Sequence, residues 1–138
     1  MTDLLEMINL GNRNVDRLSE PGELRAAAEQ VSEIAHNHGA ATLLAASSAA
    51  ERIIGAVLVG HADLAHGLHT STQPHPDSVL IVDINVASGT ALARAARRAR
   101  QSGAERVVAV VLYQLTMELP DPRTWDIDHL IVIDHEES

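Results

Sequence analysis

Residues 79–92 read VLIVDINVASGTAL, and they carry the strongest structural signal in the chain. The first four, 79–82, are apolar and mostly β-branched, which predicts a fully buried strand. A short loop of small residues centred on Gly89 follows, and then residues 91–100, which are rich in strong helix formers. A strand, a tight loop and a helix leave backbone N–H groups free at the helix N-terminus, where they can bind an anion. Asp83 follows the strand directly, at the edge where open α/β sheets bind their ligands.

The composition limits the class of protein. The chain has 138 residues, of which 46% are hydrophobic, and we expect them to form a single domain, residues 1–138, with its own core. There is no Phe and only one Trp, so small aliphatic side chains must fill that core. Cys is absent, which excludes disulfides and thiolate chemistry.

The charge of the chain argues against nucleic-acid partners. The formal net charge is −9 at pH 7, all ten basic residues are Arg, and a nucleic-acid-binding protein needs a basic face. Four arginines of one predicted helix, Arg94, Arg97, Arg98 and Arg100, are expected to form a solvated face. No apolar run reaches the roughly 20 residues of a membrane span. The first residues also lack the basic region that begins a secretory signal peptide. We therefore expect no membrane partner and a cytoplasmic location.

Helices and buried aliphatic strands alternate along the chain. The patterns predict helices over 23–37, 49–59 and 91–101 and strands over 41–46, 79–82, 106–113 and 129–134. Residues 1–13 form a short amphipathic N-terminal segment, residues 60–78 a hood-like loop and residues 135–138 an acidic tail. This order predicts a three-layer α/β domain with a central, mainly parallel sheet.

The residues around Asp83 resemble those of the type I phosphoribosyltransferases. In that family a hydrophobic strand leads into two adjacent acidic residues, two aliphatic residues and a small, Thr-rich loop that contains Gly. The corresponding residues here are 79–82, Asp83-Ile84, Asn85-Val86 and Ala87-Ser88-Gly89-Thr90-Ala91. The order of elements fits over about residues 14–134, and Leu18-Ser19-Glu20-Pro21 is similar to the orotate subgroup. The resemblance implies a phosphoribosyltransferase-like fold in which residues 60–78 form a reduced hood.

The resemblance also implies a function. The loop 87–91 would bind the 5-phosphate of phosphoribosyl pyrophosphate, and Asp83, as the catalytic residue, would hold the ribose hydroxyls. The turn after the first strand, with Ser47, Ser48 and Arg52, would face the pyrophosphate. Mg²⁺ would bridge ribose and pyrophosphate oxygens, as its preference for oxygen ligands allows. The reaction would be a glycosyl transfer of nucleotide metabolism, from phosphoribosyl pyrophosphate or a related ribose phosphate to a nitrogenous base.

Several residues depart from the family pattern. Ile84 stands where the second acid is expected, and Ala91 where the last loop Thr is expected. The pyrophosphate-side turn has no Gly and contains Glu51, whose charge opposes pyrophosphate. These departures leave two functions open: phosphoribosyl transfer, or a catalytically inactive regulatory or partner-binding module that kept the fold. A homodimer is compatible with both.

Each candidate residue also has a structural interpretation. Asp83 can cap its own loop through backbone N–H groups, and Ser88–Thr90 can be an ordinary turn with Thr90 as the N-cap. Arg52 can be a surface residue paired with Glu51. Trp125 is expected to fill the core rather than to stack on a base.

The histidines of the hood-like loop suggest a third function, a metal-dependent hydrolase. His61, His66, His69 and His75 lie in this loop, but their spacing matches no zinc motif, and neither do His36 and His38. We therefore expect solvated loop histidines and assign no metal ligands from the sequence.

Overall fold

The computed structural model describes residues 4–61, 63–66, 78–116 and 118–134. The elements follow in the order α1 (Leu4–Arg17), α2 (Pro21–Asn37), β1 (Thr42–Ala45), α3 (Glu51–Gly60), β2 (Ala65–His66), β3 (Ser78–Val86), α4 (Thr90–Gln101), β4 (Arg106–Gln114), the 3-10 turn η1 (Pro122–Trp125) and β5 (His129–Asp134).

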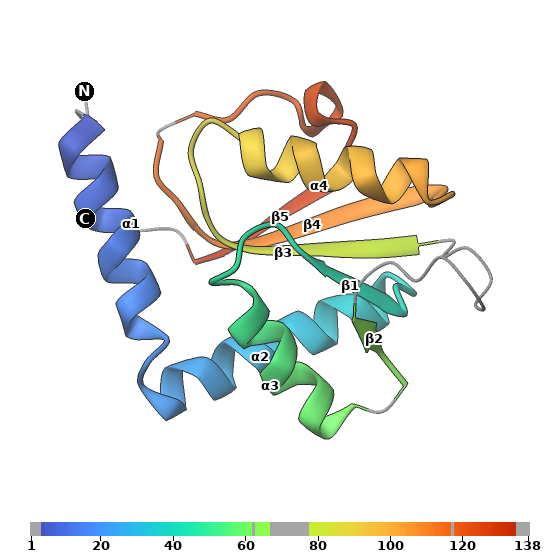
Figure 1. Ribbon diagram of the computed structural model, residues 1–138, viewed down its shortest axis with the longest axis horizontal. Coiled ribbons are helices and arrows are strands. Elements are labelled where there is room, and N and C mark those ends of the chain that lie inside the picture. The colour runs from blue at the N-terminus through green and yellow to red at the C-terminus, as the bar shows by residue number, and fades with distance from the viewer. Residues whose placement is uncertain (1–3, 62, 67–77, 117, 135–138) are drawn as a thin grey trace.

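The strands form one sheet in the order β2-β1-β3-β4-β5, and every pairing among them is parallel. Helices α2 and α3 cover one face of this sheet and α4 covers the other (Figure 1). The three-layer α/β architecture with a parallel sheet is therefore confirmed. The crossovers explain it, because a parallel strand can return only through a connection that crosses one face.

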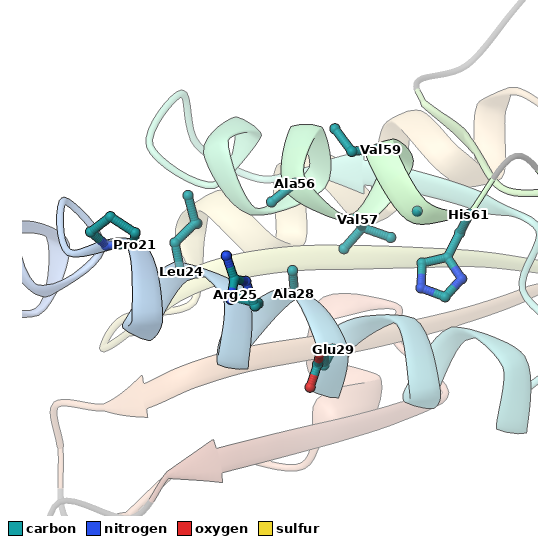
Figure 2. Close-up of a pocket in the computed structure, with 10 residues that line it drawn as sticks. Pro21, Leu24, Arg25, Ala28, Glu29, Ala56, Val57, Val59 and His61 are labelled. Atoms are coloured by element: carbon teal, nitrogen blue, oxygen red, sulfur yellow. The ribbon is translucent and has the colours of Figure 1, made fainter.

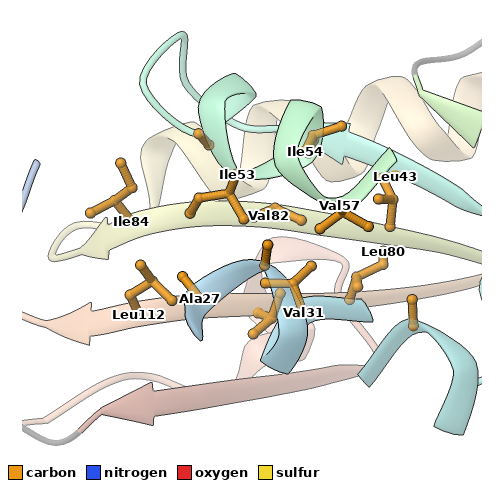
Figure 3. Packing of buried hydrophobic residues seen from close by; sticks show 14 of the residues in the cluster. Ala27, Val31, Leu43, Ile53, Ile54, Val57, Leu80, Val82, Ile84 and Leu112 are labelled. Atoms are coloured by element: carbon orange, nitrogen blue, oxygen red, sulfur yellow. The ribbon is translucent and has the colours of Figure 1, made fainter. Parts of the chain in front are cut away.

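Alternating side chains of β3 build the two halves of the core. Leu80, Val82 and Ile84 point toward α2 and α3, where they pack against Ile53 and other aliphatic side chains (Figure 3). Residues on the opposite side of the strand, such as Ile81, pack under α4. Because both faces are covered, the strand is apolar throughout residues 79–82, as the sequence predicted.

β3 runs past the predicted end at residue 82. Its pairing with β1 stops at Ala45–Val82, whereas its pairing with β4 continues to Val86–Gln114. The reason is that β4 is nine residues long and offers partners that β1 lacks. Asp83 thus lies inside β3 but beyond the end of β1, and the place next to Asp83 that β1 does not reach is called the crevice below.

Helix α1 stands at the carboxyl end of the sheet (Figure 1), and it is longer than the N-terminal segment predicted over 1–13. Asn14, which is fully buried, donates from Nδ2 to Oδ1 of Asn85 at 2.8 Å. The amide of Asn85 donates in turn to the carbonyl of Gly11 at 3.2 Å. These two bonds attach α1 to the end of β3.

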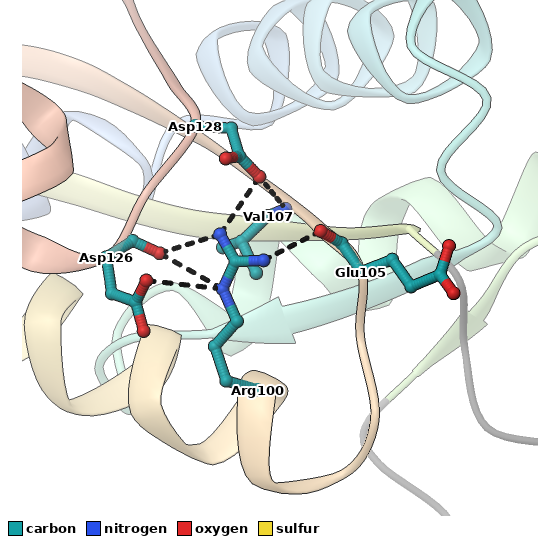
Figure 4. A network of polar contacts seen from close by, with 5 residues as sticks. All are labelled: Arg100, Glu105, Val107, Asp126 and Asp128. Carbon is teal, nitrogen blue, oxygen red and sulfur yellow. Dashed lines mark hydrogen bonds and ion pairs between the residues drawn. The ribbon is translucent and has the colours of Figure 1, made fainter.

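Arg100 is not part of a purely solvated helix face, contrary to the prediction. From α4 its guanidinium donates to the carbonyls of Glu105 (2.7 Å) and Asp126 (3.1 Å) and to the carboxylate of Asp128 (2.9 Å; Figure 4). The same carboxylate oxygen accepts from the backbone N–H of Val107 at 2.8 Å. This network fixes η1 and its flanking residues over α4.

Candidate functional site

The crevice between β1 and β3 is the topological switch point of the sheet. After β1 the chain turns to α3 on one face, and after β3 it turns to α4 on the other. The two connections therefore separate and leave the carboxyl ends of the strands uncovered between them. In open α/β sheets this is where ligands bind.

Asp83 and Ser47, which the sequence predicted separately, meet in this crevice. The Ser47 hydroxyl donates to Oδ1 of Asp83 at 2.7 Å, and the same oxygen accepts from the backbone N–H of Ile84 at 2.8 Å. Asp83 is buried, with 6% of its surface exposed. Burial raises the pKa of the Asp83 carboxyl, and the two hydrogen bonds oppose that shift in part. Among the described residues, the second carboxylate oxygen has no hydrogen-bond partner.

The loop after β3 places small polar side chains next to a helix N-terminus. Gly89 is the N-cap residue of α4, with φ of 80°, and it provides no side-chain cap. The expected alternative, Thr90 as the N-cap, is therefore wrong; Thr90 is the first helical residue. Its hydroxyl lies 3.1 Å from that of Ser88. The first N–H groups of α4 lack intrahelical partners, as in every helix, and that of Thr90 donates to the Ser88 hydroxyl at 3.4 Å.

Two pockets open on either side of this loop. One, of about 170 Å³, is lined by Asp83, Asn85 and residues 86–92 together with Leu115. The other, of about 330 Å³, is lined by Ser88–Thr90, Ala93, Trp125 and two exposed arginines, Arg94 and Arg97. Arg94 and Arg97 were predicted on a solvated helix face, and they are exposed, but it was not predicted that they line a pocket beside the loop. The signal was their spacing, since positions four and seven residues after Thr90 share its face of the helix.

Trp125 presses against the loop from η1. It is 7% exposed and belongs to the core on the α4 side, as predicted. A Cβ on Gly89 would overlap its indole ring. The absence of a side chain at Gly89 therefore serves the approach of Trp125, and its positive φ is one that Gly adopts without strain.

The remaining predicted residues divide into two groups. Ala87 and Ala91 line the smaller pocket together with Asp83, whereas Ser48 and Arg52 are exposed and line neither of the two pockets. No ion pair between Glu51 and Arg52 is present in the described part of the chain. Ile84 points away from the crevice, into the core under α2 and α3.

A wider groove, of about 420 Å³, lies elsewhere, between α2 and α3 (Figure 2). Its lining is mostly aliphatic and includes Leu24 and Val57, with His61 at one end (Figure 2). It contains none of the predicted site residues. Part of the predicted hood and tail lies outside the described residues: the side chain of His66, residues 67–77 with His69 and His75, and residues 135–138.

The comparisons with known proteins do not assign a family to the chain. No protein-family model matches it, and no curated protein matches it in sequence. None of the helices among the described residues is long and apolar enough to cross a membrane.

Proposed function

We propose that this chain binds a phosphorylated ribose compound, of the phosphoribosyl pyrophosphate or nucleotide class, at the carboxyl edge between β1 and β3. The observation that carries the proposal is the 2.7 Å hydrogen bond between Ser47 and Asp83, which joins the turn after β1 to β3 near a helix N-terminus whose cap residue, Gly89, has no side chain. A buried carboxylate accepts hydrogen bonds from sugar hydroxyls, and free backbone N–H groups donate to phosphate. The resemblance to the type I phosphoribosyltransferases agrees with this pairing of groups.

The phosphate would bind at the loop 87–91. The hydroxyls of Ser88 and Thr90 add donors to the backbone N–H groups of α4. Arg94 and Arg97 supply positive charge in the adjoining pocket, in a chain whose net charge is −9. This local charge matters because a phosphate would otherwise approach a protein that repels it.

The ribose would bind to Asp83 through its second carboxylate oxygen, while Oδ1 keeps its bonds to Ser47 and Ile84. Ser47 contacts Asp83 in the crevice, and a pyrophosphate would extend from there toward Ser48 and Arg52, which follow Ser47 in the chain. Mg²⁺ would fit here with the ligand, because it takes one carboxylate together with phosphate oxygens and waters.

A second candidate function, binding without phosphoribosyl transfer, is favoured by the position of Ile84. Its side chain is 1% exposed and packs under α2 and α3, on the face of the sheet away from the crevice. A carboxylate at this position would be buried without a partner and could not reach the ribose. The site thus offers one carboxylate where the transferases present two acidic residues.

Calorimetry with phosphoribosyl pyrophosphate, with and without Mg²⁺, tests the proposal on the full chain. Wild type should bind in a Mg²⁺-dependent way, and Asp83→Asn and Ser88→Ala/Thr90→Val should each weaken binding by at least about tenfold, as expected for charge-assisted hydrogen bonds. Ser102→Ala is the matched control, because Ser102 lies at the opposite end of α4.

The outcomes separate the candidates. Equal affinity for inorganic phosphate and phosphoribosyl pyrophosphate would show that the site binds an anion and does not recognise the ribose. No binding at millimolar ligand would refute the proposal. Binding without consumption of the ligand, with a panel of nucleobases added, would support the non-transferring function.

A further inference from the structure

A second cluster of polar side chains lies at the opposite end of the sheet, where the strands begin. Helix α2 ends just before β1, and α3 ends just before β2, so the ends of both helices lie at the amino edge of the strands. His36 belongs to the last turn of α2, His61 is the C-cap residue of α3, and Asp63 follows two residues later. The packing of α2 on α3 brings these three residues together.

The three side chains can offer one ligand atom each to a common centre. Those atoms all lie within 4.8 Å of one another. Nε2 of His36 is 2.8 Å from Oδ2 of Asp63, and the rings of His36 and His61 have their centroids 5.4 Å apart. Ligands of a tetrahedral zinc ion lie about 3.3 Å apart, given metal–ligand bonds of about 2.0–2.1 Å. Rotation of exposed side chains closes the difference, because His36 is 44% and Asp63 is 63% exposed.

The surroundings favour a cation. The carbonyl ends of two helices converge on the cluster, and a helix C-terminus attracts positive charge. Asp63 adds a carboxylate. Two imidazoles with one carboxylate form a donor set that suits Zn²⁺ and neighbouring transition metals rather than Mg²⁺ or Ca²⁺, which prefer oxygen ligands.

We propose that His36, His61 and Asp63 bind one divalent transition-metal ion, with Zn²⁺ as the expected occupant and a fourth position open to water. The ion would tie the end of α2 to the chain that leads into β2. It lies at the edge of the sheet opposite Asp83, so its role is to hold the fold at this edge, and it is independent of the proposed ribose-phosphate site.

A second histidine pair provides a built-in control. The rings of His38 and His129 have their centroids 5.5 Å apart, much like those of His36 and His61. Nη2 of Arg106, however, lies 3.2 Å from Nδ1 of His38, and no carboxylate completes a ligand group there among the described residues. The guanidinium charge opposes a metal at this pair, so loss of His38 should leave metal binding unchanged.

Titration of the full, tag-free chain with Zn²⁺ by calorimetry and with Co²⁺ by visible absorption tests the proposal. We expect one Zn²⁺ per chain, a Co²⁺ spectrum of low coordination number, and a higher melting temperature with Zn²⁺. His61→Ala and Asp63→Asn should weaken binding at least about tenfold, since even groups that only support a ligand are worth that much. His38→Ala should bind as wild type.

Two results would overturn the proposal. One is the absence of stoichiometric Zn²⁺ binding at micromolar metal. The other is unchanged affinity in His61→Ala and Asp63→Asn, which would place the bound ion elsewhere. Because the substituted side chains are at least partly exposed, both variants should fold, and their melting temperatures without metal check this.

Discussion

Gly89→Ala tests whether the loop between β3 and α4 is shaped by Trp125. The added Cβ would lie 2.6 Å from the indole Nε1 and closer still to Cε2 and Cζ2, whereas ordinary contacts begin at 3.4 Å. Trp125 would have to move by roughly 1 Å or more to restore a favourable distance. The substitution also forces Ala into the left-handed region, since φ is 80° at this position.

The strained backbone and the overlap with Trp125 each lower the unfolding free energy of Gly89→Ala. The left-handed backbone costs a non-glycine residue about 1–2 kcal/mol. Overpacking of a filled site costs about 1–3 kcal/mol more. Gly39→Ala is the matched control, because Gly39 also has a positive φ, of 65°, but has open space where its Cβ would be. The excess cost of Gly89→Ala over Gly39→Ala therefore measures the contact with Trp125.

Chemical denaturation measures the difference in unfolding free energy between the two variants, and Trp fluorescence reports on the surroundings of Trp125. The excess should be about 1–3 kcal/mol of unfolding free energy, or a melting temperature lower by roughly 3–10 °C for a chain of this size. Trp125 is the only Trp in the chain, so its emission should shift to the red in Gly89→Ala and stay unchanged in Gly39→Ala. Equal costs for the two variants, with identical emission, would refute the packing of Trp125 on the loop.

Three further perturbations have expected outcomes. Asp83→Asn should raise the unfolding free energy at pH 7, because burial disfavours the charged form of Asp83 and raises its pKa. As the pH falls through that raised pKa toward 3.8, Asp83 becomes protonated in the folded protein, and the stability difference between wild type and the variant should shrink. Asp128→Asn should have the opposite effect, because the hydrogen bond from Val107 lowers the pKa of Asp128. The Asp128 carboxylate should therefore stabilise the wild type above pH 3.8, and this stabilisation should be lost in acid and be absent from the variant at every pH. Asn14→Ala should cost about 1–3 kcal/mol in urea denaturation by leaving Asn85 Oδ1 without its donor.

The sequence predicted the parts of the fold that have a clear periodicity. Strand β5 has the predicted bounds, β4 ends one residue later, and α2 begins two residues earlier. Buried aliphatic strands and Ala-rich helices differ in pattern and length, so each is recognised locally. The extension of β3 to Val86 could not be found this way, because Asp83 and Asn85 break the apolar run and only pairing with β4 holds them in the strand.

A general rule predicted one part of the candidate site. The carboxyl ends of parallel strands lie at the same end of the sheet, so Asp83, directly after a predicted strand, was expected at a ligand-binding position, whereas Ser47 was named only from the resemblance. No such rule joins His36 to His61 and Asp63. Their meeting depends on how α2 packs on α3, and the intervening residues give no sign of it.

The ionisation of Asp83 links the fold to the proposed function. A carboxylate in a crevice with 6% exposure loses hydration, and the bonds from Ser47 and Ile84 replace that hydration only in part, so the pKa rises. The fold alone would be better served by a neutral side chain of the same shape. Ligand hydroxyls that donate to the second oxygen would stabilise the charged form, so binding should lower the pKa of Asp83. Affinity should then increase with pH through the raised pKa of the free protein, and this increase should disappear in Asp83→Asn.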